Sequence, residues 1–463
     1  MTRRIIFLLF ALLLEANVSA QVMPRAGTHF SFGIPEGSDG LIDPTLGSGQ
    51  SLLLVNILSM YDGKGIITSP NGYCQDFTFT ADSVTTIELP YSFMHLRDIG
   101  KTNKGVLIKT SQPSCVVFHD FLQEAGEATQ IYPDDALDTS YRITTWGLFD
   151  DPTEDNHTQF VITATQDNTD VTIVPSVLTL GNHPANVPIT TTLNRGECYM
   201  VKADTNGLPL VTSLSNSTVR STKPVSIIAG VSCGYNPLGV ESCDELLDEV
   251  LPMKYSDTIF YVVPLRDSFV TNTVLFTSEV KAYFVIPSNG AVTSSTNGRA
   301  EINISGPTSF QLTTGTNVPA LAQCFLLSEG SDRQITGDPS IVTILPRSQY
   351  VDTLIWYTPA FTGPVQFSPG PFLDYVSVVY PKLSEAQVLL DGSPITSRSF
   401  PQPIGASPMQ GAVALIKPGV HRLTSPVPIF ATVSGFADAD GYSFLPGTVA
   451  PQLPEDTIPT LLD

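Results

Sequence analysis

β-Branched and polar residues alternate through most of the chain, whereas the three- to four-residue spacing of an amphipathic helix is nearly absent. In the stretch FVITATQDNTDVTIVP, residues 160–175, the side chains of Phe160, Ile162 and Ala164 fall on one face. A polar turn follows at 166–170, and a second apolar run comes after it. This pattern predicts a β-hairpin.

The same plan recurs along the chain. Strand, polar turn and strand, closed by Pro, Gly or Asn, follow one another at 52–72, 273–290 and 374–394. After each predicted hairpin, a polar turn with a proline precedes an apolar strand, at Pro113, Pro224, Pro339 and Pro428. A proline at an edge or first strand position is harmless, because no ladder hydrogen bond is lost there.

Two signatures that alternate in the same order predict repeated units. The expected fold is all-β, with about four related β-sandwich-like or β-rich units packed together in tandem and very little helix. Their expected ranges are 21–143, 144–266, 267–365 and 366–450, followed by a loose tail at 451–463.

The N-terminus predicts secretion. Arg3 and Arg4 precede the apolar run 5–14, and small residues at Val18-Ser19-Ala20 form a cleavage site, which is the pattern of a signal peptide over 1–20. The run is too short to span a bilayer, so no membrane insertion is expected. A net charge of −21 argues against nucleic acid and anionic membranes as partners.

Six cysteines in a secreted chain predict disulfides, with 15 possible connectivities: Cys74, Cys115, Cys198, Cys233, Cys243 and Cys324. Cys74 and Cys115 lie in the first unit and form one candidate pair, whereas Cys198 and Cys324 either bridge units or remain buried thiols. Glycosylation sequons occur at Asn156, Asn216 and Asn303.

The stretch VSCGYNPLGVESCDELLDEVLP, residues 231–252, allows several interpretations. The spacing of Cys233 and Cys243 is too wide for a Cys-X-X-Cys redox site, and the absence of histidine argues against zinc. The carboxylates could hold calcium, but the leucines between them predict a two-turn amphipathic helix over 244–251 with its acids toward solvent. A local disulfide that closes the loop is the favoured interpretation.

The chain resembles the family of the IgGFc-binding protein N-terminal domain. The resemblance rests on Lys223-Pro224-Val225, Cys233, Cys243-Asp244-Glu245-Leu246, Leu251-Pro252 and FYVVPL at 260–265. The opening GTHFSFGIP at 27–35 and the closing HRLTSPVPIFATVSGFADADGYSFLPG at 421–447 extend it over about 27–450. The resemblance implies a secreted protein that binds an extracellular protein, such as an immunoglobulin Fc region.

Motifs of catalysis are lacking. The sequence has no Gly-x-Ser-x-Gly, His-Glu-x-x-His or phosphate-binding glycine loop, and His119 beside Asp120 is the sharpest catalytic candidate. Acidic loops at 150–156 and 438–441 are predicted to be solvated turns rather than calcium sites. No cofactor, metal or catalytic residue is therefore expected.

These observations favour a non-enzymatic protein that recognises an extracellular protein or glycan at a mucosal or matrix surface. A structural or adhesive matrix component is the alternative, and a hydrolase on a β scaffold is a remote one. Tyr235 and Leu238, within the loop between the two cysteines, are the candidate partner-binding residues, since apolar and aromatic side chains anchor protein interfaces.

Overall fold

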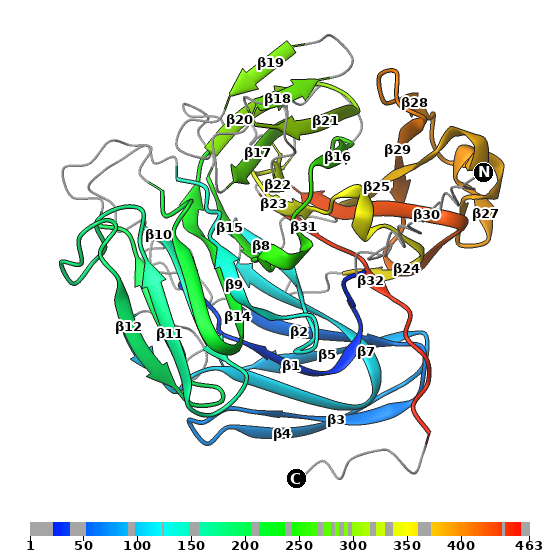
Figure 1. The fold of residues 1–463 in the computed structure, drawn as a ribbon. Coiled ribbons are helices and arrows are strands. Elements are labelled where there is room, and N and C mark those ends of the chain that lie inside the picture. Colours follow the sequence, from blue (N-terminus) through cyan, green and yellow to red (C-terminus); the bar gives the residue numbers. More distant parts are fainter. Residues whose placement is uncertain are drawn as a thin grey trace, which may run out of the picture.

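The protein is described by a computed structural model, and it is an all-β molecule (Figure 1). The structure describes residues 22–37, 52–90, 98–122, 125–147, 157–204, 213–236, 243–265, 272–278, 283–286, 291–294, 299–314, 321–328, 337–359, 372–437 and 440–454. The predicted signal peptide lies outside the described residues. Only short 3-10 helices interrupt the described strands, at Met253–Tyr255 (η3), Arg347–Gln349 (η4), Lys382–Gln387 (η6) and Ile395–Ser397 (η7).

The first two groups of strands follow one another along the chain. The first comprises β1 (Gly27–Phe32), β2 (Leu52–Ser59), β3 (Gly63–Thr68), β4 (Cys74–Phe79), β5 (Ser83–Leu89), β6 (Gly100–Thr102), β7 (Val106–Leu122) and β8 (Ala125–Ile131). The second comprises β9 (Asp138–Arg142), β10 (Thr158–Ala164), β11 (Thr169–Val174), β12 (Ile189–Leu193), β13 (Cys198–Lys202), β14 (Thr218–Gly234) and β15 (Asp244–Glu249). Except for β6, which pairs with β13, each group forms its own sheet.

Two further groups complete the chain. The third comprises β16 (Ile259–Val262), β17 (Asn272–Ser278), β18 (Tyr283–Ile286), β19 (Ala291–Ser294), β20 (Arg299–Ile304), β21 (Thr308–Thr313), β22 (Ala322–Leu327) and β23 (Ile341–Ile344), in two sheets. The fourth comprises β24 (Val351–Thr358), β25 (Leu373–Pro381), β26 (Leu389–Leu390), β27 (Ser393–Pro394), β28 (Gln402–Pro403), β29 (Met409–Ile416), β30 (Gly419–Ala437), β31 (Asp440–Phe444) and β32 (Gly447–Thr448).

One pairing plan recurs in all four groups. In the first, second and fourth groups, one long strand forms the axis: β7, β14 and β30 respectively. In the third group, β21 and the following strand β22 together take the place of that long strand. The first half of the axis pairs with β3, β11, β18 or β26, and the second half pairs with β2, β10, β17 or β25. A final strand, β8, β15, β23 or β31, then pairs with the second half.

The four predicted hairpins are therefore wrong, and all in the same way. The strands on either side of each polar turn do not pair with each other but run on in one direction along the axis strand. β10, for example, pairs with 225–231 of β14, and β11 pairs with 218–221 of the same strand. Alternation along the chain shows which face of a strand is buried, but it does not reveal which strand lies beside it.

The prolines mark the point where the axis strand passes between its two halves. Pro113, Pro224 and Pro428 lie inside β7, β14 and β30, where the pairing register shifts. An edge or first strand position was predicted for them, but an irregularity in the ladder equally removes the need for a proline N–H. Pro339 differs, because it precedes the final strand β23 rather than lying in an axis strand.

From this plan we infer units that comprise β1–β8, β9–β15, β16–β23 and β24–β31. The divisions suggested from the sequence, after residues 143, 266 and 365, would separate β9, β16 and β24 from the axis strands with which they pair. We therefore place each division one strand earlier. Each unit then begins with a strand that pairs with the first half of its own axis.

The final strands of the four units meet in the middle of the molecule (Figure 1). β8 packs against β15 and β31, and β23 packs against the same two strands. We call this meeting point the central junction. It closes the units into a ring, so that the first unit contacts the last.

Segments near both ends of the described chain reinforce that closure. The N–H of Met23 donates to Gln349 Oε1 (2.8 Å) ahead of β24, and the side chain of Gln112 exchanges two hydrogen bonds with the backbone of Leu453. Residues more than three hundred positions apart are thereby held together, and the seam between the first and last units becomes a fixed feature of the molecule.

The expected helix over 244–251 is wrong. Residues 244–249 form the strand β15, and every one of them is buried. Asp244 lies in the central junction, where Oδ1 accepts the N–H groups of Gly126 (2.7 Å) and Glu245 (2.7 Å) and Oδ2 accepts that of Gly441 (3.2 Å). One carboxylate therefore joins the first, second and fourth units, because a buried acceptor needs donors and the neighbouring backbones supply them.

Glu127 on β8 makes the complementary connections. Its Oε1 accepts the N–H groups of Ala128 (3.1 Å) and Ser443 (2.7 Å), and its Oε2 accepts that of Ile341 (2.8 Å). Burial raises the pKa of Glu127 well above its usual value, and these N–H groups oppose that shift. The first, third and fourth units therefore meet on this side chain.

Asp248, the third of these carboxylates, links the second unit to the first and third. It accepts the hydroxyl of Thr129 (2.6 Å) on β8 and both the N–H and the hydroxyl of Thr343 (2.7 Å each) on β23. Burial raises its pKa to about 6. Asp244 and Asp248 were expected to face solvent. Instead, their hydrogen bonds connect the units at the central junction.

Candidate functional site

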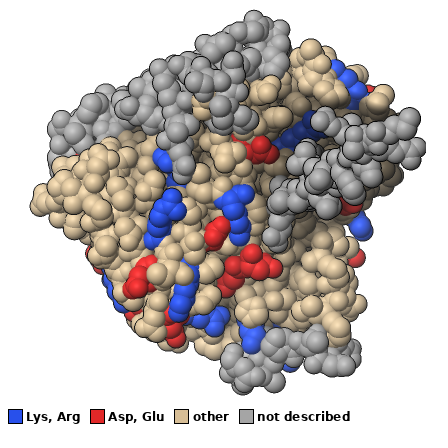
Figure 2. Space-filling view, viewed as in Figure 1, with Lys and Arg blue, Asp and Glu red and all other residues tan. Residues whose placement is uncertain are grey.

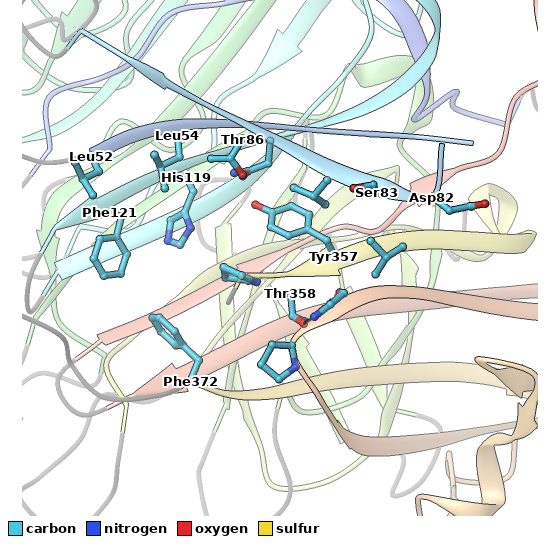
Figure 3. Close-up of a pocket in the computed structure, with 16 residues that line it drawn as sticks. Leu52, Leu54, Asp82, Ser83, Thr86, His119, Phe121, Tyr357, Thr358 and Phe372 are labelled. Atoms are coloured by element: carbon cyan, nitrogen blue, oxygen red, sulfur yellow. Dashed lines mark hydrogen bonds between the residues drawn. The ribbon is translucent and has the colours of Figure 1, made fainter. Parts of the chain in front are cut away.

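An open cleft of about 700 Å³ lies along the seam between the first and last units (Figure 3). Side chains of β2, β5 and β7 form one wall, with Leu52, Leu54 and Val84 among them. Tyr357 of β24, Val420 of β30 and neighbouring residues form the other wall. The cleft exists only because the ring closes, since its two walls are remote in the sequence.

Aromatic side chains line the inner end of the cleft. In Figure 3, His119 and Phe121 project from β7 toward Tyr357 and Phe372 on the opposite wall. The rings of Phe121 and Phe372 meet edge to face at 6.5 Å between centroids, and His119 and Phe121 do so at 5.6 Å. Such contacts hold the rings in place, so the cleft presents a preformed apolar surface.

Polar side chains line part of the cleft, Asp82 and Ser83 among them, and several of the others are already engaged in hydrogen bonds within the chain. The hydroxyl of Thr86 donates to Asn56 Oδ1 (2.8 Å), and the hydroxyl of Thr358 donates to the carbonyl of Lys417 (3.0 Å). Apolar contact is therefore the main interaction this cleft offers. A ligand that fits it would insert an apolar or aromatic group and meet polar atoms only at the edge.

His119 lines the cleft, but it does not form a dyad with Asp120. Consecutive side chains on a strand point to opposite faces, and Asp120 faces Gly37 and Glu245 instead. Burial lowers the pKa of His119 to about 4, so its imidazole is neutral at physiological pH. Within the described residues its Nε2 has no hydrogen-bond partner. The arrangement lacks the carboxylate that would orient a general base.

Charge does not single out a partner on the face of the molecule shown in Figure 2. Lysine and arginine side chains are interspersed there with aspartate and glutamate side chains. Mixed charges of this kind keep a surface soluble without a strong field of one sign.

Cys233 and Cys243 are joined by a disulfide that links the end of β14 to the start of β15. Residues 237–242 between them, with Leu238, lie outside the described residues. The carbonyl of Tyr235 accepts the indole N–H of Trp146 (2.6 Å), and Asn236 donates to the carbonyl of Ser328 (2.7 Å) in the third unit. The start of the loop is thus bonded to its surroundings, and a binding role for Tyr235 and Leu238 stays a prediction.

The structure does not bring Cys74 and Cys115 together. Cys74 pairs with Thr68 on β3, and Thr68 pairs with Leu107 on β7. Cys115 lies eight residues further along β7 than Leu107, which is roughly 25 Å along a strand. A disulfide requires Cα atoms within about 7 Å. Cys74 is an exposed thiol and Cys115 a buried one.

The other cysteines are buried thiols as well. Cys198 lies in the core shared by the first two units, whereas Cys324 lies in the core of the third and fourth. Burial raises the pKa of the thiols of Cys115 and Cys198 to about 12 each. These three thiols are therefore protonated and poorly reactive.

The sequons occupy different environments. Asn303 is exposed on β20, a position open to a glycan. Asn216 is half-buried with a positive φ of 71°, and the neighbouring Ser217 is fully buried. Asn156 lies outside the described residues. Glycosylation at all three positions stays a prediction, and Asn303 has the most accessible side chain of the two that are described.

The described residues include no group of three or more His, Cys, Asp or Glu side chains that could hold a metal ion. The acidic loop at 150–156 and residues 438–439 lie outside the described residues. Asp440 and Gly441 belong to β31 and are buried, although a solvated turn was predicted for them. That prediction is wrong for these two residues, because the central junction covers them.

Among the described residues, none of the helices is long and apolar enough to cross a membrane. Comparison with curated proteins finds no match. Comparison with family models matches residues 127–435 to the model described as IgGFc binding protein, which covers more than half of the chain. The matched region begins in β8, includes the cysteine pair and ends in β30. The chain therefore belongs to the IgGFc-binding protein family.

Proposed function

We propose that this chain is a secreted, glycosylated and non-enzymatic protein that binds an extracellular protein, such as one with an immunoglobulin Fc region, at a mucosal or matrix surface. The family description names binding rather than a reaction. The observation that carries the proposal is the preformed apolar cleft on the seam between the first and last units. Protein partners commonly place an aromatic or aliphatic anchor in a pocket of this kind.

The cleft favours a protein ligand over a glycan. Glycan binding depends on several hydrogen-bonding groups beside an aromatic face, but the Asn56, Thr86 and Thr358 side chains already bond within the chain. An apolar side chain needs no such groups. The loop that carries Tyr235 and Leu238 is a second candidate surface, and it serves as the alternative in the test below.

We expect Val420→Arg to weaken binding of an immunoglobulin G Fc fragment to the immobilised full chain by at least about tenfold. Val420 lies in the cleft and is 39% exposed. An arginine there places a charge where the ligand's apolar group must enter, and that charge loses water on binding. Surface plasmon resonance measures the dissociation constants, and a glycan array tests the other ligand class.

Val187→Arg is the matched control. Val187 is 48% exposed and does not line the cleft, so the variant should bind as the wild type does. If both arginine variants bind the Fc fragment equally well, the cleft is not the binding site, and Tyr235→Ala with Leu238→Ala is the next pair to measure. If the wild type captures no Fc fragment, the proposed ligand is wrong.

A structural or adhesive role is the second candidate, and one observation favours it. Leu383 on η6 and Phe400 beyond η7 are fully exposed, with relative exposures of 103% and 90%. Large apolar side chains exposed in this way often mark association surfaces. If the chain assembles with itself, its sedimentation coefficient should rise with concentration, and Phe400→Ser should reduce that rise. A wild type that stays monomeric at all concentrations argues against this role.

A further inference from the structure

We propose that the carboxyl group of Asp440 holds a proton in the folded protein, so that the central junction is a pH-responsive element that is most stable in acidic fluid. This inference does not depend on the proposed function. It starts from the surroundings of one side chain at the point where the four units meet.

Asp440 is fully buried at the start of β31, and neither of its carboxyl oxygens has a hydrogen-bond partner among the described residues. The adjacent N–H of Gly441 donates to Asp244 Oδ2 (3.2 Å); it lies near the Asp440 carboxyl group but not in hydrogen-bond geometry with it. Gly126 on β8 lies against Oδ1 of Asp440, where a β-carbon would approach to 3.4 Å. An ionised carboxylate without donors in such a place would be very costly, whereas the neutral acid is not.

The groups that face Asp440 are acidic. Asp244 comes from β15 and Asp338 from the segment before β23, and Glu127 of β8 lies near Asp244. β30 brings Phe436 and Ala437 to this end of its pairing with β31. Burial raises the pKa of Asp440 well above its usual value, and the charge of Asp338 raises it further, against a smaller opposing effect of the Gly441 N–H.

The acidic character extends beyond these neighbours. Carboxyl oxygens of Asp120 on β7 and Glu245 on β15 both lie beside Gly37, each 3.0 Å from the place where its β-carbon would be. The buried Arg25 is placed elsewhere, close to Tyr132 and Cys115. Carboxyl groups this close to one another cannot all ionise, so at least one of them keeps its proton. Asp440, without donors, is the group that gains most from keeping it.

A proton explains the site better than a metal ion does. Calcium takes six to eight oxygen ligands, but the oxygens of Asp244 and Glu127 are already engaged with backbone N–H groups. The described residues also form no group of ligands that could hold a metal. The oxygens of Asp440 therefore have too few other free oxygen ligands around them to bind a cation.

The direction of the pH dependence follows from the two states. In the unfolded chain an aspartate titrates near about 3.9, and below that pH both states are protonated. As the pH rises above that value, the unfolded chain releases a proton that the folded chain keeps. The unfolding equilibrium constant therefore increases by up to about tenfold per pH unit for this group, until the pH passes the folded-state pKa. Stability is highest in acid and falls toward neutral pH.

The test compares the full-length wild type with Asp440→Asn by urea unfolding at several values between about pH 5 and pH 7. Asparagine has nearly the same shape and cannot ionise, so the variant's unfolding constant should rise less steeply, by up to about tenfold per pH unit. Asp76→Asn, on the exposed strand β4, is the matched control and should keep the wild-type slope. Calcium and a chelator should leave the wild-type midpoint unchanged.

Three results would overturn the proposal. The first is an equal pH dependence in the wild type and Asp440→Asn. The second is a calcium-dependent stabilisation that the variant loses, which would assign the site to a cation. The third is that neither Asp440→Asn nor the smaller neutral variant Asp440→Ser folds at any pH in the range, because the charge itself would then be required.

Discussion

Glu127→Ala should lower the free energy of unfolding by roughly 3–5 kcal/mol, since each buried donor left without an acceptor costs about 1–3 kcal/mol. The substitution leaves the N–H groups of Ala128, Ser443 and Ile341 without their acceptor. Those groups belong to three units, so the loss falls on the central junction as a whole. Release of the buried carboxylate from its desolvation cost offsets part of this effect. Urea unfolding followed by circular dichroism measures the change.

Glu127→Gln is the matched control for this prediction. Glutamine keeps one carbonyl acceptor in nearly the same place but turns an NH₂ group toward one of the donors. Its stability should therefore fall between those of the wild type and the alanine variant. If Glu127→Ala unfolds at the same urea concentration as the wild type, the Glu127 carboxylate does not hold the units together. Apolar contacts between the units would then have to maintain the ring.

Loss of the disulfide should have the second largest effect. Replacement of both Cys233 and Cys243 by serine should lower the free energy of unfolding by roughly 2–3 kcal/mol, as the chain-entropy model gives for so short a loop. The bond restricts the conformations that the unfolded chain can adopt between residues 233 and 243. The contacts of Asn236 with Ser328 and Thr273 remain in the folded variant. Urea unfolding again gives the difference.

Cys74→Ser supplies the control, because Cys74 is exposed and unbonded, and a surface substitution of this kind changes stability by less than about 0.5 kcal/mol. A reductant should bring the wild type to the stability of the double variant and leave the double variant unchanged. Two results together would show that Cys233 and Cys243 are not bonded. The reductant would leave the stability of the wild type unchanged, and a thiol reagent would label one of the two cysteines.

Local patterns determined much of the architecture. Alternation of apolar and polar residues fixes the all-β class, because a strand with one buried face requires a two-residue period. The recurrence of the proline signature at Pro113, Pro224 and Pro428 indicated related units, and these prolines do occupy equivalent places in β7, β14 and β30. The family also follows from local motifs around the paired cysteines and the strand ends.

Local patterns could not predict which strands pair with each other. The strands on either side of each polar turn look like a hairpin in sequence. In the first two units, however, each pairs with a different half of a strand that comes roughly forty to seventy residues later. Two collinear strands and a hairpin have the same alternation of side chains. Only the position of the axis strand distinguishes them, and that position depends on long-range pairing.

The acids of β15 illustrate the same limit most clearly. Leucines spaced among carboxylates indicate a surface helix, since an unpaired charge is rarely buried. Here Asp244 and Asp248 are buried because backbone and hydroxyl donors from β8, β23 and β31 receive them. The cleft has the same origin, with walls drawn from the first and last units. The sequence by itself determined the all-β class and the recurrence of related units. The closing of the ring decided which polar groups are buried and where a ligand fits, because donors and cleft walls come from parts of the chain that meet only in the folded protein.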